Sequence, residues 1–361
     1  MHRPTHAIID LNAARRNLER VRKWAPGRRL MAVVKADGYG HGIERIADAF
    51  ALADAFGVCC LDEAHALRRS GREQEVVLLA GCAAAEELRE AAALKLSVVV
   101  HDESQLRLLE RASPRQTVRA WLKIDSGMHR LGFAPEAVAD AWRRLRGIAS
   151  VKPPVRLMTH LAAASTPGHS LNALQLRRFS ECVNGLEGER SIANSAALMT
   201  LPESHADWLR PGLILYGASP LPQGNGTAAG LRPVMSLRSR LIAVRQMRAG
   251  ERVGYGGNWS CPADMPVGIV AAGYGDGYPR HASAGTPVLV GGKMAALIPP
   301  ASMDLLAVDL RACPRAKIGD PVTLWGKELP VETVAARADT IPHQLLCSLG
   351  RRVRIVERGL S

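Results

Sequence analysis

The sequence lacks the features of a secreted, membrane-spanning or disulfide-stabilised protein. Its first residues, MHRPTHAIIDLNAARRNLERV, contain no apolar core of a secretory signal, and no apolar run approaches the ~18 residues that span a bilayer. The 7 cysteines are an odd number and include no C-x-x-C pair, which argues against a disulfide framework and against a zinc site. We therefore expect a cytoplasmic, reduced protein without a bound metal.

Aromatic residues are also scarce, at 4% of the chain, although the net charge is +13. Such a charge raises the possibility of nucleic-acid binding. However, the arginines are scattered through helix-type segments such as AARRNLERVRK and WRRLRG, with no interleaved aromatic residues on which bases could stack. The sequence therefore predicts no nucleic-acid partner, and the positive charge favours anionic small molecules only in a general way.

From Ala7 to about Tyr216, short apolar runs alternate with segments that have apolar residues at helical spacing. The runs include AIID, LMAVVKA, EVVLLA, VRLMTHLA, RSIANS and GLILYG. This alternation predicts an α/β fold with parallel strands and crossover helices. About eight such units suit a closed (β/α)8 barrel of the TIM type, although spacing alone leaves an open doubly wound sheet as the alternative.

The composition of the sequence and the pattern of its apolar runs change near Gly217. The segment GASPLPQGNGTAAGLRP is typical of a linker or an exposed loop, and the short β-type runs that follow are separated by turn residues. The only long helical candidate in this part is VETVAARA. We expect a boundary between Ser219 and Arg232, with a barrel domain over residues 1–225 and an all-β domain over residues 226–361.

Polar side chains recur where the apolar runs of the first domain end, which is where the active site of a parallel barrel is built. Structural capping explains any one of them, but is a strained account of the whole series. The lysine in MAVVKADGYGHG is the most telling, because a lysine at the end of a strand either extends its amine to solvent or forms a Schiff base with a carbonyl cofactor. The series comprises Lys35, Tyr39, Lys123, Asp125, His129, Arg130, His160, Asn194, Ser195 and Arg210.

The segment AVVKADGYGHG closely resembles the cofactor-lysine motif of alanine racemases, which are pyridoxal-phosphate enzymes with a barrel and a C-terminal β domain. KIDSGMHRLGF, THLAAAS, ANSAA, LRPGLILYG, VGYGGNW, GYGDGYPR and SMD resemble further segments of this family, in the same order. Together these segments cover residues 7–352. The resemblance implies a racemase that interconverts L- and D-alanine, and it leaves open whether the D-alanine supplies peptidoglycan synthesis or is degraded.

The resemblance also implies the residues that hold pyridoxal 5'-phosphate. Lys35 would carry the cofactor as a Schiff base, and Arg210 would face the pyridine nitrogen, with His160 hydrogen-bonded to it. A guanidinium does not readily give up a proton, so the ring nitrogen would stay largely unprotonated and side reactions would be limited. The remaining cofactor contacts would come from Tyr39, Asn194, Ser195, Gly212, Leu213 and His343.

Racemisation requires a base on each face of a planar intermediate. The resemblance assigns one face to Lys35 and the other to Tyr255 of the partner subunit, which implies an obligate homodimer with shared active sites. Cationic neighbours of Tyr255 would be His160, Arg210 and Arg280. Arg130 and the Met303 amide would bind the substrate carboxylate, while Tyr274 would narrow the entrance. Lys123 matches a position that some members carbamylate, and a lysine paired with a carboxylate is the alternative.

The chain departs from the family pattern in two places. Gly-Arg-Val usually precedes the S-M-D segment, whereas this chain reads LIPPASMD, so Pro299 and Pro300 restrict the backbone before Met303. A tyrosine is expected where His343 stands in IPHQLL. We expect altered cofactor affinity or turnover. The rival interpretations are a racemase of wider range, a barrel-type amino-acid decarboxylase, and a cofactor-binding protein without catalysis.

Overall fold

The computed structural model describes residues 3–113 and 115–359, which form two compact units. The barrel unit contains Leu18–Leu215 and Pro220–Gln223. The sheet unit contains the described residues before Leu18 and after Gln223, together with Tyr216–Ser219. No helix within the described ranges has both the length and the apolar character needed to cross a bilayer.

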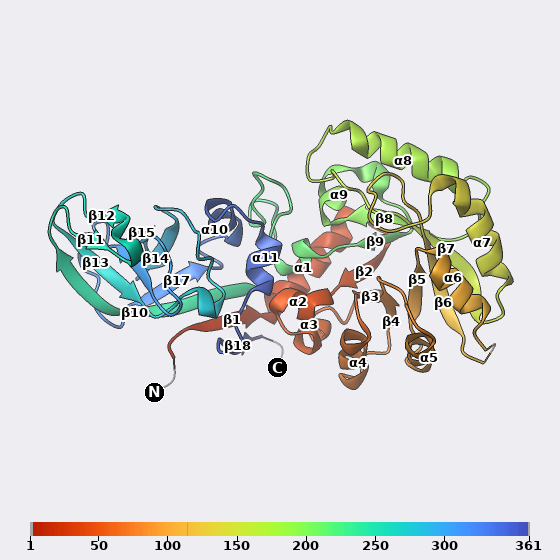
Figure 1. Cartoon of the computed structure of the whole chain (residues 1–361), viewed down its shortest axis with the longest axis horizontal. Coiled ribbons are helices and arrows are strands. Elements are labelled where there is room, and N and C mark those ends of the chain that lie inside the picture. The colour runs from red at the N-terminus through yellow and green to blue at the C-terminus, as the bar shows by residue number, and fades with distance from the viewer. Residues whose placement is uncertain (1–2, 114, 360–361) are drawn as a thin grey trace. The chain divides into compact units, whose positions relative to one another are not determined.

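The barrel unit is built on a closed parallel barrel in which the strands follow one another in chain order (Figure 1). Strand β2 pairs in parallel with both β3 and β9, which closes the ring and leaves no open edge. This settles the choice between a closed barrel and an open sheet. The strands are β2 (Arg29–Val33), β3 (Ala55–Val58), β4 (Glu75–Leu78), β5 (Ser97–Val100), β6 (Val118–Lys123), β7 (Val151–Met158), β8 (Arg190–Asn194) and β9 (Trp208–Arg210).

Helices follow the barrel strands, as the periodicity of the sequence predicts. The α-helices are α1 (Leu11–Trp24), which leads from the sheet unit into the barrel unit, α2 (Lys35–Gly40), α3 (Ile43–Ala49), α4 (Leu61–Arg69), α5 (Ala85–Ala93), α6 (Glu103–Glu110), α7 (Val138–Gly147), α8 (Ser170–Cys182) and α9 (Ser195–Thr200). Short 3-10 helices are η1 (Pro135–Ala137), η2 (Pro202–Ser204) and η3 (Leu213–Tyr216).

Packed side chains fill the interior of the barrel. Seven strands each contribute one residue to this core, namely Met31, Ala55, Val77, Val99, Trp121, Met158 and Trp208. The two tryptophan rings meet edge to face with centroids 5.8 Å apart, and the Arg156 guanidinium lies over both rings. Arg156 also forms ion pairs of 2.6 Å with Glu75 and 2.8 Å with Glu189. Because the barrel is filled, ligands are confined to its ends.

The sheet unit contains one large sheet, ordered β13-β16-β15-β14-β17-β10-β1-β18, in which β13 also pairs with β10. Its strands are β1 (His6–Asp10), β10 (Met235–Met247), β13 (Met265–Val270), β14 (Pro287–Val290), β15 (Lys293–Ile298), β16 (Leu306–Asp309), β17 (Pro321–Trp325) and β18 (Arg354–Arg358). Smaller elements are β11 (Arg252–Val253), β12 (Trp259–Ser260), η4 (Tyr255–Gly257), η5 (Tyr274–Asp276), α10 (Val331–Arg337) and α11 (Pro342–Cys347). The helix expected at VETVAARA is α10.

Two strand predictions are wrong. The run AIID does not belong to the barrel: β1 pairs antiparallel with β10 and parallel with β18, so the start of the expected range 1–225 lies in the sheet unit. A short apolar run identifies a strand but not its partner. The run GLILYG is the 3-10 helix η3, and the last barrel strand is β9, just before it. Pro211 follows β9 directly and, lacking an N–H, favours an end to the strand there.

Candidate active site

The barrel brings most of the expected polar residues to one end. Lys123, Asn194 and Arg210 are the last residues of β6, β8 and β9, while Lys35 and His160 follow β2 and β7 by two residues. The carboxyl ends of parallel barrel strands share one face, so these side chains come together although they are distant in the sequence. The wrong strand assignment around GLILYG does not alter this outcome, because Arg210 ends β9.

The backbone after Lys35 is unusual. Ala36, Asp37, Gly38 and Tyr39 all have φ between 52° and 62° and ψ between 42° and 52°, so this part of α2 is a left-handed turn. Left-handed residues other than glycine are normally single, because the Cβ crowds the following carbonyl at about 1–2 kcal/mol per residue. The sequence motif contains three glycines but did not indicate that Ala36, Asp37 and Tyr39 share this conformation. We call Ala36–Tyr39 the left-handed turn.

Side chains hold the left-handed turn from both ends. At its start, Glu63 Oε1 accepts hydrogen bonds from the Ala36 amide at 2.6 Å and the Asp37 amide at 3.4 Å. At its end, the His41 ring lies 3.1 Å from the Gly38 carbonyl and 2.8 Å from the Tyr39 carbonyl through Nδ1. Both partners are acceptors, so Nδ1 carries the proton. Burial lowers the pKa of His41 to about 4, which keeps the ring neutral at pH 7.

Tyr39 packs against the segment that follows β9. The Gly212 amide donates to Ser195 Oγ at 2.8 Å, and a Cβ placed on Gly212 would lie only 2.4 Å from the Tyr39 hydroxyl oxygen. Gly212 is therefore required by the close approach of the Tyr39 phenol. Leu213 comes next and begins η3. The hydroxyl groups of Tyr39 and Ser195 and the backbone around Gly212 thus form a small cluster of polar atoms at the barrel end.

Arg210 is buried, with 6% of its surface exposed. Its guanidinium donates to Ser191 Oγ and to the Thr159 carbonyl at 2.5 Å each, and to the Ile192 carbonyl at 3.2 Å. Burial lowers the pKa of Arg210 to about 10, so it remains charged at neutral pH. None of its partners in the described residues is a carboxylate, which makes Arg210 a fixed positive charge held by neutral acceptors.

His160 connects Arg210 to Asn194. Arg210 Nη2 lies 3.4 Å from His160 Nδ1, and Asn194 Nδ2 lies 3.4 Å from His160 Nε2, so both contacts are at the long limit of hydrogen bonding. Burial, followed by the charges of Arg210, Lys123, Arg130 and Lys35, holds the pKa of His160 well below its usual range. His160 is therefore a neutral ring among cations.

Lys123 belongs to the same positive cluster. Burial and the charges of Arg210, Arg130 and Lys35 lower its pKa to about 8. Among residues 3–113 and 115–359, no carboxylate lies within ion-pair distance of Lys35, Lys123 or Arg130. The alternative, in which Lys123 pairs with a carboxylate, is therefore not seen in the described structure. The cluster attracts anions.

The loop that carries Arg130 is fixed by Asp125. One oxygen of this carboxylate accepts hydrogen bonds from the amides of Gly127, Met128 and His129 at 2.9–3.0 Å. The other oxygen lies 3.2 Å from Nδ1 of the exposed His129. Asp125 and His129 therefore shape the loop, whereas the Arg130 side chain remains available to a ligand.

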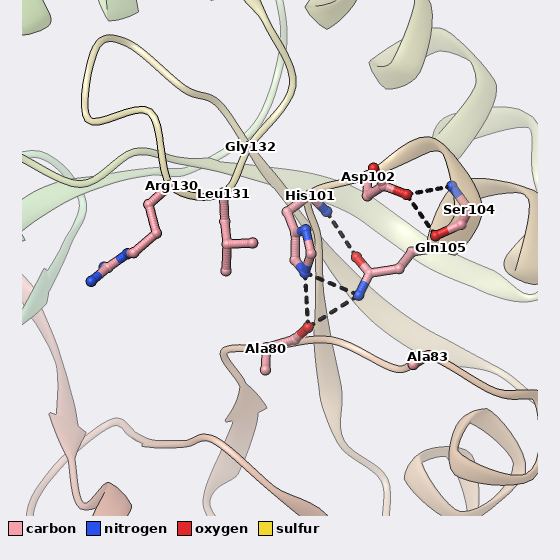
Figure 2. Close-up of a pocket in the computed structure, with 9 residues that line it drawn as sticks. All are labelled: Ala80, Ala83, His101, Asp102, Ser104, Gln105, Arg130, Leu131 and Gly132. Carbon is pink, nitrogen blue, oxygen red and sulfur yellow. Dashed lines mark hydrogen bonds between the residues drawn. The ribbon is translucent and has the colours of Figure 1, made fainter.

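Arg130 lines a cavity of about 400 Å³ in the barrel unit, shown in Figure 2. On its far side, His101 Nε2 and Gln105 Nε2 each donate to the Ala80 carbonyl at 3.0 Å. Sequence reasoning did not select His101 or Gln105, although His101 directly follows the run SVVV and could have been found as another polar residue at a strand end. The full lining comprises Ala80, Ala83, His101, Asp102, Ser104, Gln105, Arg130, Leu131 and Gly132.

Three expected site residues of the sheet unit are exposed. Tyr255 has 70% of its surface exposed, Met303 has 54% and Tyr274 has 40%. The loops that carry Tyr274 and Met303 are joined, since the Tyr274 amide donates to the Ser302 carbonyl at 3.0 Å and the Gly275 amide to the Met303 carbonyl at 2.9 Å. The Arg280 guanidinium lies 5.9 Å from the centre of the Tyr274 ring, so its described contact is with Tyr274.

Asp276 organises these two loops and was not selected from the sequence. Its carboxylate has no exposed surface and forms ion pairs of 2.7 Å with Arg3 and 2.8 Å with Arg352. Arg352 also contacts the Met303 carbonyl at 3.1 Å and the Asp304 carboxylate at 2.6 Å. Residues from both ends of the chain therefore fix the edge on which Tyr274 and Met303 stand.

The two departures from the family pattern also lie in the sheet unit. Pro299 and Pro300 lie beside the Tyr255 loop, because a Cβ placed on Gly254 would lie 3.9 Å from Pro300 Cδ. His343 stands in the first turn of α11. Within the described residues, no group of three or more histidine, cysteine or acidic side chains could hold a metal ion.

Comparison with known proteins places this geometry in a family. The model of the alanine racemase N-terminal domain matches residues 9–220, and that of the alanine racemase C-terminal domain matches residues 234–357. The chain belongs to the alanine racemase family. It is 53% identical to the alanine racemase of Nitrosococcus oceani over 347 residues, covering 96% of this chain and 97% of that one. It is 46% identical to the catabolic alanine racemase of Klebsiella aerogenes over 357 residues, covering 99% of both chains.

Solved structures of alanine racemases have the same fold. The biosynthetic alanine racemase of Pseudomonas aeruginosa superposes with a TM-score of 0.96 at 43% identity, covering 99% of this chain and 100% of that chain. The combination of a closed parallel barrel and a separate C-terminal sheet, expected from the sequence, is confirmed. The family resemblance found in the motifs is confirmed as well.

Proposed function

We propose that this protein interconverts L- and D-alanine with pyridoxal 5'-phosphate as its cofactor, in the cytoplasm. The observation that carries the proposal is the barrel end itself, where Lys35, Lys123, Arg130 and the buried Arg210 place four positive charges around the neutral ring of His160. All 7 cysteines are free, which fits a reducing compartment. Relatives bear both biosynthetic and catabolic names, so the proposal includes either direction of use.

The residues present fit the cofactor. Its phosphate is an anion, and the Tyr39 and Ser195 hydroxyls, together with the amides of Gly212 and Leu213, offer donors in a region without a Cβ at Gly212. The surrounding charges of Lys35, Lys123, Arg130 and Arg210 are all positive. An anionic ligand would therefore relieve a repulsion that the protein alone does not balance.

When bound, the cofactor supplies a carbonyl group that attaches to amines and withdraws electrons from Cα of the substrate. Lys35 would hold it covalently and would exchange a proton at Cα on one face. Arg210 would stand at the ring nitrogen as a donor that stays charged, since its pKa of about 10 leaves it protonated at neutral pH. His160 and Asn194 would keep the Arg210 side chain and the ring in place. A decarboxylase of this fold would instead need a carboxylate at this position.

Tyr255 would exchange the proton on the opposite face. At 70% exposure, its phenol would trade protons with water unless another surface covered it. A second copy of the chain would provide that surface, which supports a homodimer in which each sheet unit supplies Tyr255 to the partner's barrel. The proton pathways on the two faces would then come from different subunits.

Arg130 would bind the substrate carboxylate, since its charge acts on both Lys123 and His160 and it has no acidic partner in the described residues. The Met303 amide would assist, and Tyr274, backed by Arg280, would narrow the space near the methyl group. Lys123 would react with carbon dioxide in its neutral form, and its pKa of about 8 makes that form accessible. The resulting carbamate would place a negative charge among the cations.

Racemisation of L- and D-alanine, measured with and without added pyridoxal 5'-phosphate, tests the proposal directly. We expect equal approach to the racemate from both enantiomers and a requirement for the cofactor. Borohydride reduction followed by peptide mapping should mark Lys35. Turnover of serine at a comparable rate would favour a racemase of wider range. Cofactor binding without racemisation would leave a binding protein, and release of carbon dioxide from amino acids would indicate a decarboxylase.

A further inference from the structure

We propose that Glu63 is a positioning residue that holds the left-handed turn and thereby presents Lys35 and Tyr39 to the cofactor. The inference rests on the proposed function for the identity of the ligand. Glu63 lies in the first turn of α4, on a different strand-helix unit from Lys35. It is therefore well placed to couple the exits of two neighbouring barrel strands.

The Glu63 carboxylate connects these exits through hydrogen bonds to the backbone alone. Oε1 accepts from the amides of Ala36 and Asp37, and Oε2 accepts from the Cys59 amide at 2.8 Å. Cys59 directly follows β3, whereas Ala36 directly follows Lys35. One side chain thus fixes the turn after β2 to the end of β3, the strand that pairs with β2 in parallel.

The left-handed turn needs this support. Three of its residues are not glycine, and each is strained in this conformation because its Cβ crowds the following carbonyl. The Gly38 amide is satisfied by the Val34 carbonyl, but the two preceding amides depend on Glu63. A hydrogen bond to a charged group is stronger than one between neutral groups, so the Glu63 carboxylate can offset part of the conformational cost. Glu63 offsets strain that the sequence of the turn does not relieve.

A change in the backbone of the turn would displace both Lys35 and Tyr39. Lys35 is the residue immediately before the turn, and Tyr39 is its last residue. Tyr39 packs closely against the segment after β9, because a Cβ on Gly212 would lie 2.4 Å from its hydroxyl oxygen. A displacement of about 1 Å at a reacting group can reduce a rate by about 100-fold. Relaxation of the turn would therefore slow covalent capture of the cofactor without removing any group that touches it.

Glu63→Gln tests the proposal with little change in shape. The amide oxygen can still accept from Ala36, but its NH2 group then faces the Cys59 amide, so a donor meets a donor. We expect a folded protein whose borohydride trapping of the cofactor at Lys35 is about 10-fold slower, with kcat reduced about 10-fold and the KM for alanine changed less than about 2-fold. Asp62→Asn is the matched control, because Asp62 is the exposed neighbouring carboxylate in the same helical turn. It should behave as wild type.

A second substitution separates positioning from a general loss of structure. Adding Ala36→Gly to Glu63→Gln replaces a strained residue with one that adopts a left-handed conformation readily. We expect the double variant to recover at least about 3-fold in trapping rate, whereas a defect elsewhere in α4 would not respond to a glycine in the turn. Wild-type trapping by Glu63→Gln, or no recovery in the double variant, overturns the proposal.

Hydrogen exchange on the wild-type protein provides a test that does not depend on any variant folding. The amides of Ala36 and Asp37 should be protected both with and without pyridoxal 5'-phosphate, because Glu63 holds the turn before the cofactor binds. Exchange at the rate of an open loop in the cofactor-free protein would refute the proposal. This measurement reports on Glu63 even if the wild type fails to racemise alanine, in which case only the proposed function is rejected.

Discussion

The end of the barrel unit and the loops of the sheet unit hold their functional side chains in opposite ways. In the barrel unit, Tyr39 and Arg210 have 8% and 6% of their surface exposed, whereas Tyr255 and Met303 in the sheet unit have 70% and 54%. The barrel residues sit at strand ends and are surrounded by fixed backbone groups. The sheet residues are presented outward. The barrel side chains are buried within their own unit, whereas in the proposed homodimer a second copy of the chain would cover the sheet loops.

The two regions also achieve rigidity differently. The barrel end uses short-range backbone constraints, above all the left-handed turn and the contact between Tyr39 and Gly212. The sheet loops use a buried carboxylate, Asp276, bound by arginines from distant parts of the chain. Preorganised side chains on rigid elements are what catalysis requires. Both the barrel end and the sheet loops are held rigidly, although only the side chains of the barrel end are buried.

The largest expected effect comes from removing the two proposed bases one at a time, Lys35 in the barrel unit and Tyr255 in the sheet unit, on separate chains. Lys35→Ala and Tyr255→Phe should each be inactive, since each removes one of the two bases. When the two variants exchange subunits, about half of the dimers are mixed and each has one intact site, so activity should return to at most about a quarter of wild type. Activity is measured after subunit exchange has been verified by mass-tagged chains. If exchange is verified and no activity returns, both bases belong to one chain and the comparison fails.

Arg210→Lys tests whether the barrel end depends on a fixed guanidinium. Nη1 of Arg210 donates to Ser191 and Nη2 donates to Thr159 and Ile192, so a single ammonium nitrogen cannot occupy both positions. Each buried acceptor left without a donor costs about 1–3 kcal/mol. We expect about a 100-fold loss of racemisation, together with a lower free energy of unfolding and a changed absorbance of the bound cofactor. An unchanged cofactor spectrum with wild-type kcat would contradict the assigned role.

Gly212→Ala probes the packing between Tyr39 and the segment after β9. The new Cβ would lie 2.4 Å from the Tyr39 oxygen, so the phenol must move away from its place beside Gly212, whose amide donates to Ser195. We expect the dissociation constant for pyridoxal 5'-phosphate to rise about 10-fold, equivalent to about 1.4 kcal/mol. Gly147→Ala is the control, because nothing lies within 4 Å of a Cβ there. Equal affinities of the two variants would remove Gly212 from the cofactor site.

His41 should make the barrel end sensitive to acid. Its pKa falls from 6.5 to about 4 through burial, so between these values the unfolded chain binds more protons than the folded one. Stability present above pH 6.5 is therefore lost as the pH falls toward about 4, by up to about 3 kcal/mol. Urea unfolding at several pH values measures this loss. His41→Asn should abolish the His41 contribution, and the exposed His281→Asn should retain it. The same pH dependence in both variants would exclude His41 as its source.

The smallest expected effect concerns the contribution of the sheet unit to cofactor binding. His343→Tyr restores the longer phenol that the family pattern has in this position. We expect the dissociation constant for pyridoxal 5'-phosphate to fall about 2- to 5-fold, or about 0.4–1 kcal/mol. Titration of the cofactor-free protein, followed by absorbance, provides the value. Weaker or equal binding would mean that His343 already supplies the contact, or that the alignment of IPHQLL is misplaced.

Much of the barrel could be predicted because its signals are local. Alternating apolar runs and helical segments predict the parallel strands, and polar residues at the ends of those runs predict Lys35, Lys123, His160 and Asn194 as one group. The partner of a strand is not encoded locally, which is why β1 was assigned to the barrel. Pairing with β10 and β18 depends on residues that are distant in the chain.

The supports of the site were harder to predict than the site. Glu63 resembles any acidic residue in the first turn of a helix, where the helix dipole favours it. Nothing in the sequence indicates that its carboxylate accepts hydrogen bonds from the backbone of Ala36 and Asp37, which follow a different strand. The sequence also gives no sign of the role of Asp276, because Arg3 and Arg352 contact its carboxylate only in the folded protein. Motifs report the groups that touch ligands, whereas their positioning depends on tertiary contacts.

The pairing of β1 has a consequence for the order in which the protein can be completed during synthesis. Ala7 pairs with Leu237 on one side and with Ile355 on the other, so β1 gains both of its neighbours only after residues far later in the sequence have been made. The barrel residues from Leu18 to Leu215 leave the ribosome in between. Until β10 and β18 arrive, Ile8 and Ile9 lie on a strand with two open edges, which is a template for aggregation. A chain that stops short of Arg354 would leave β1 open on one side, so this unpaired strand edge should make incomplete products prone to aggregation or degradation.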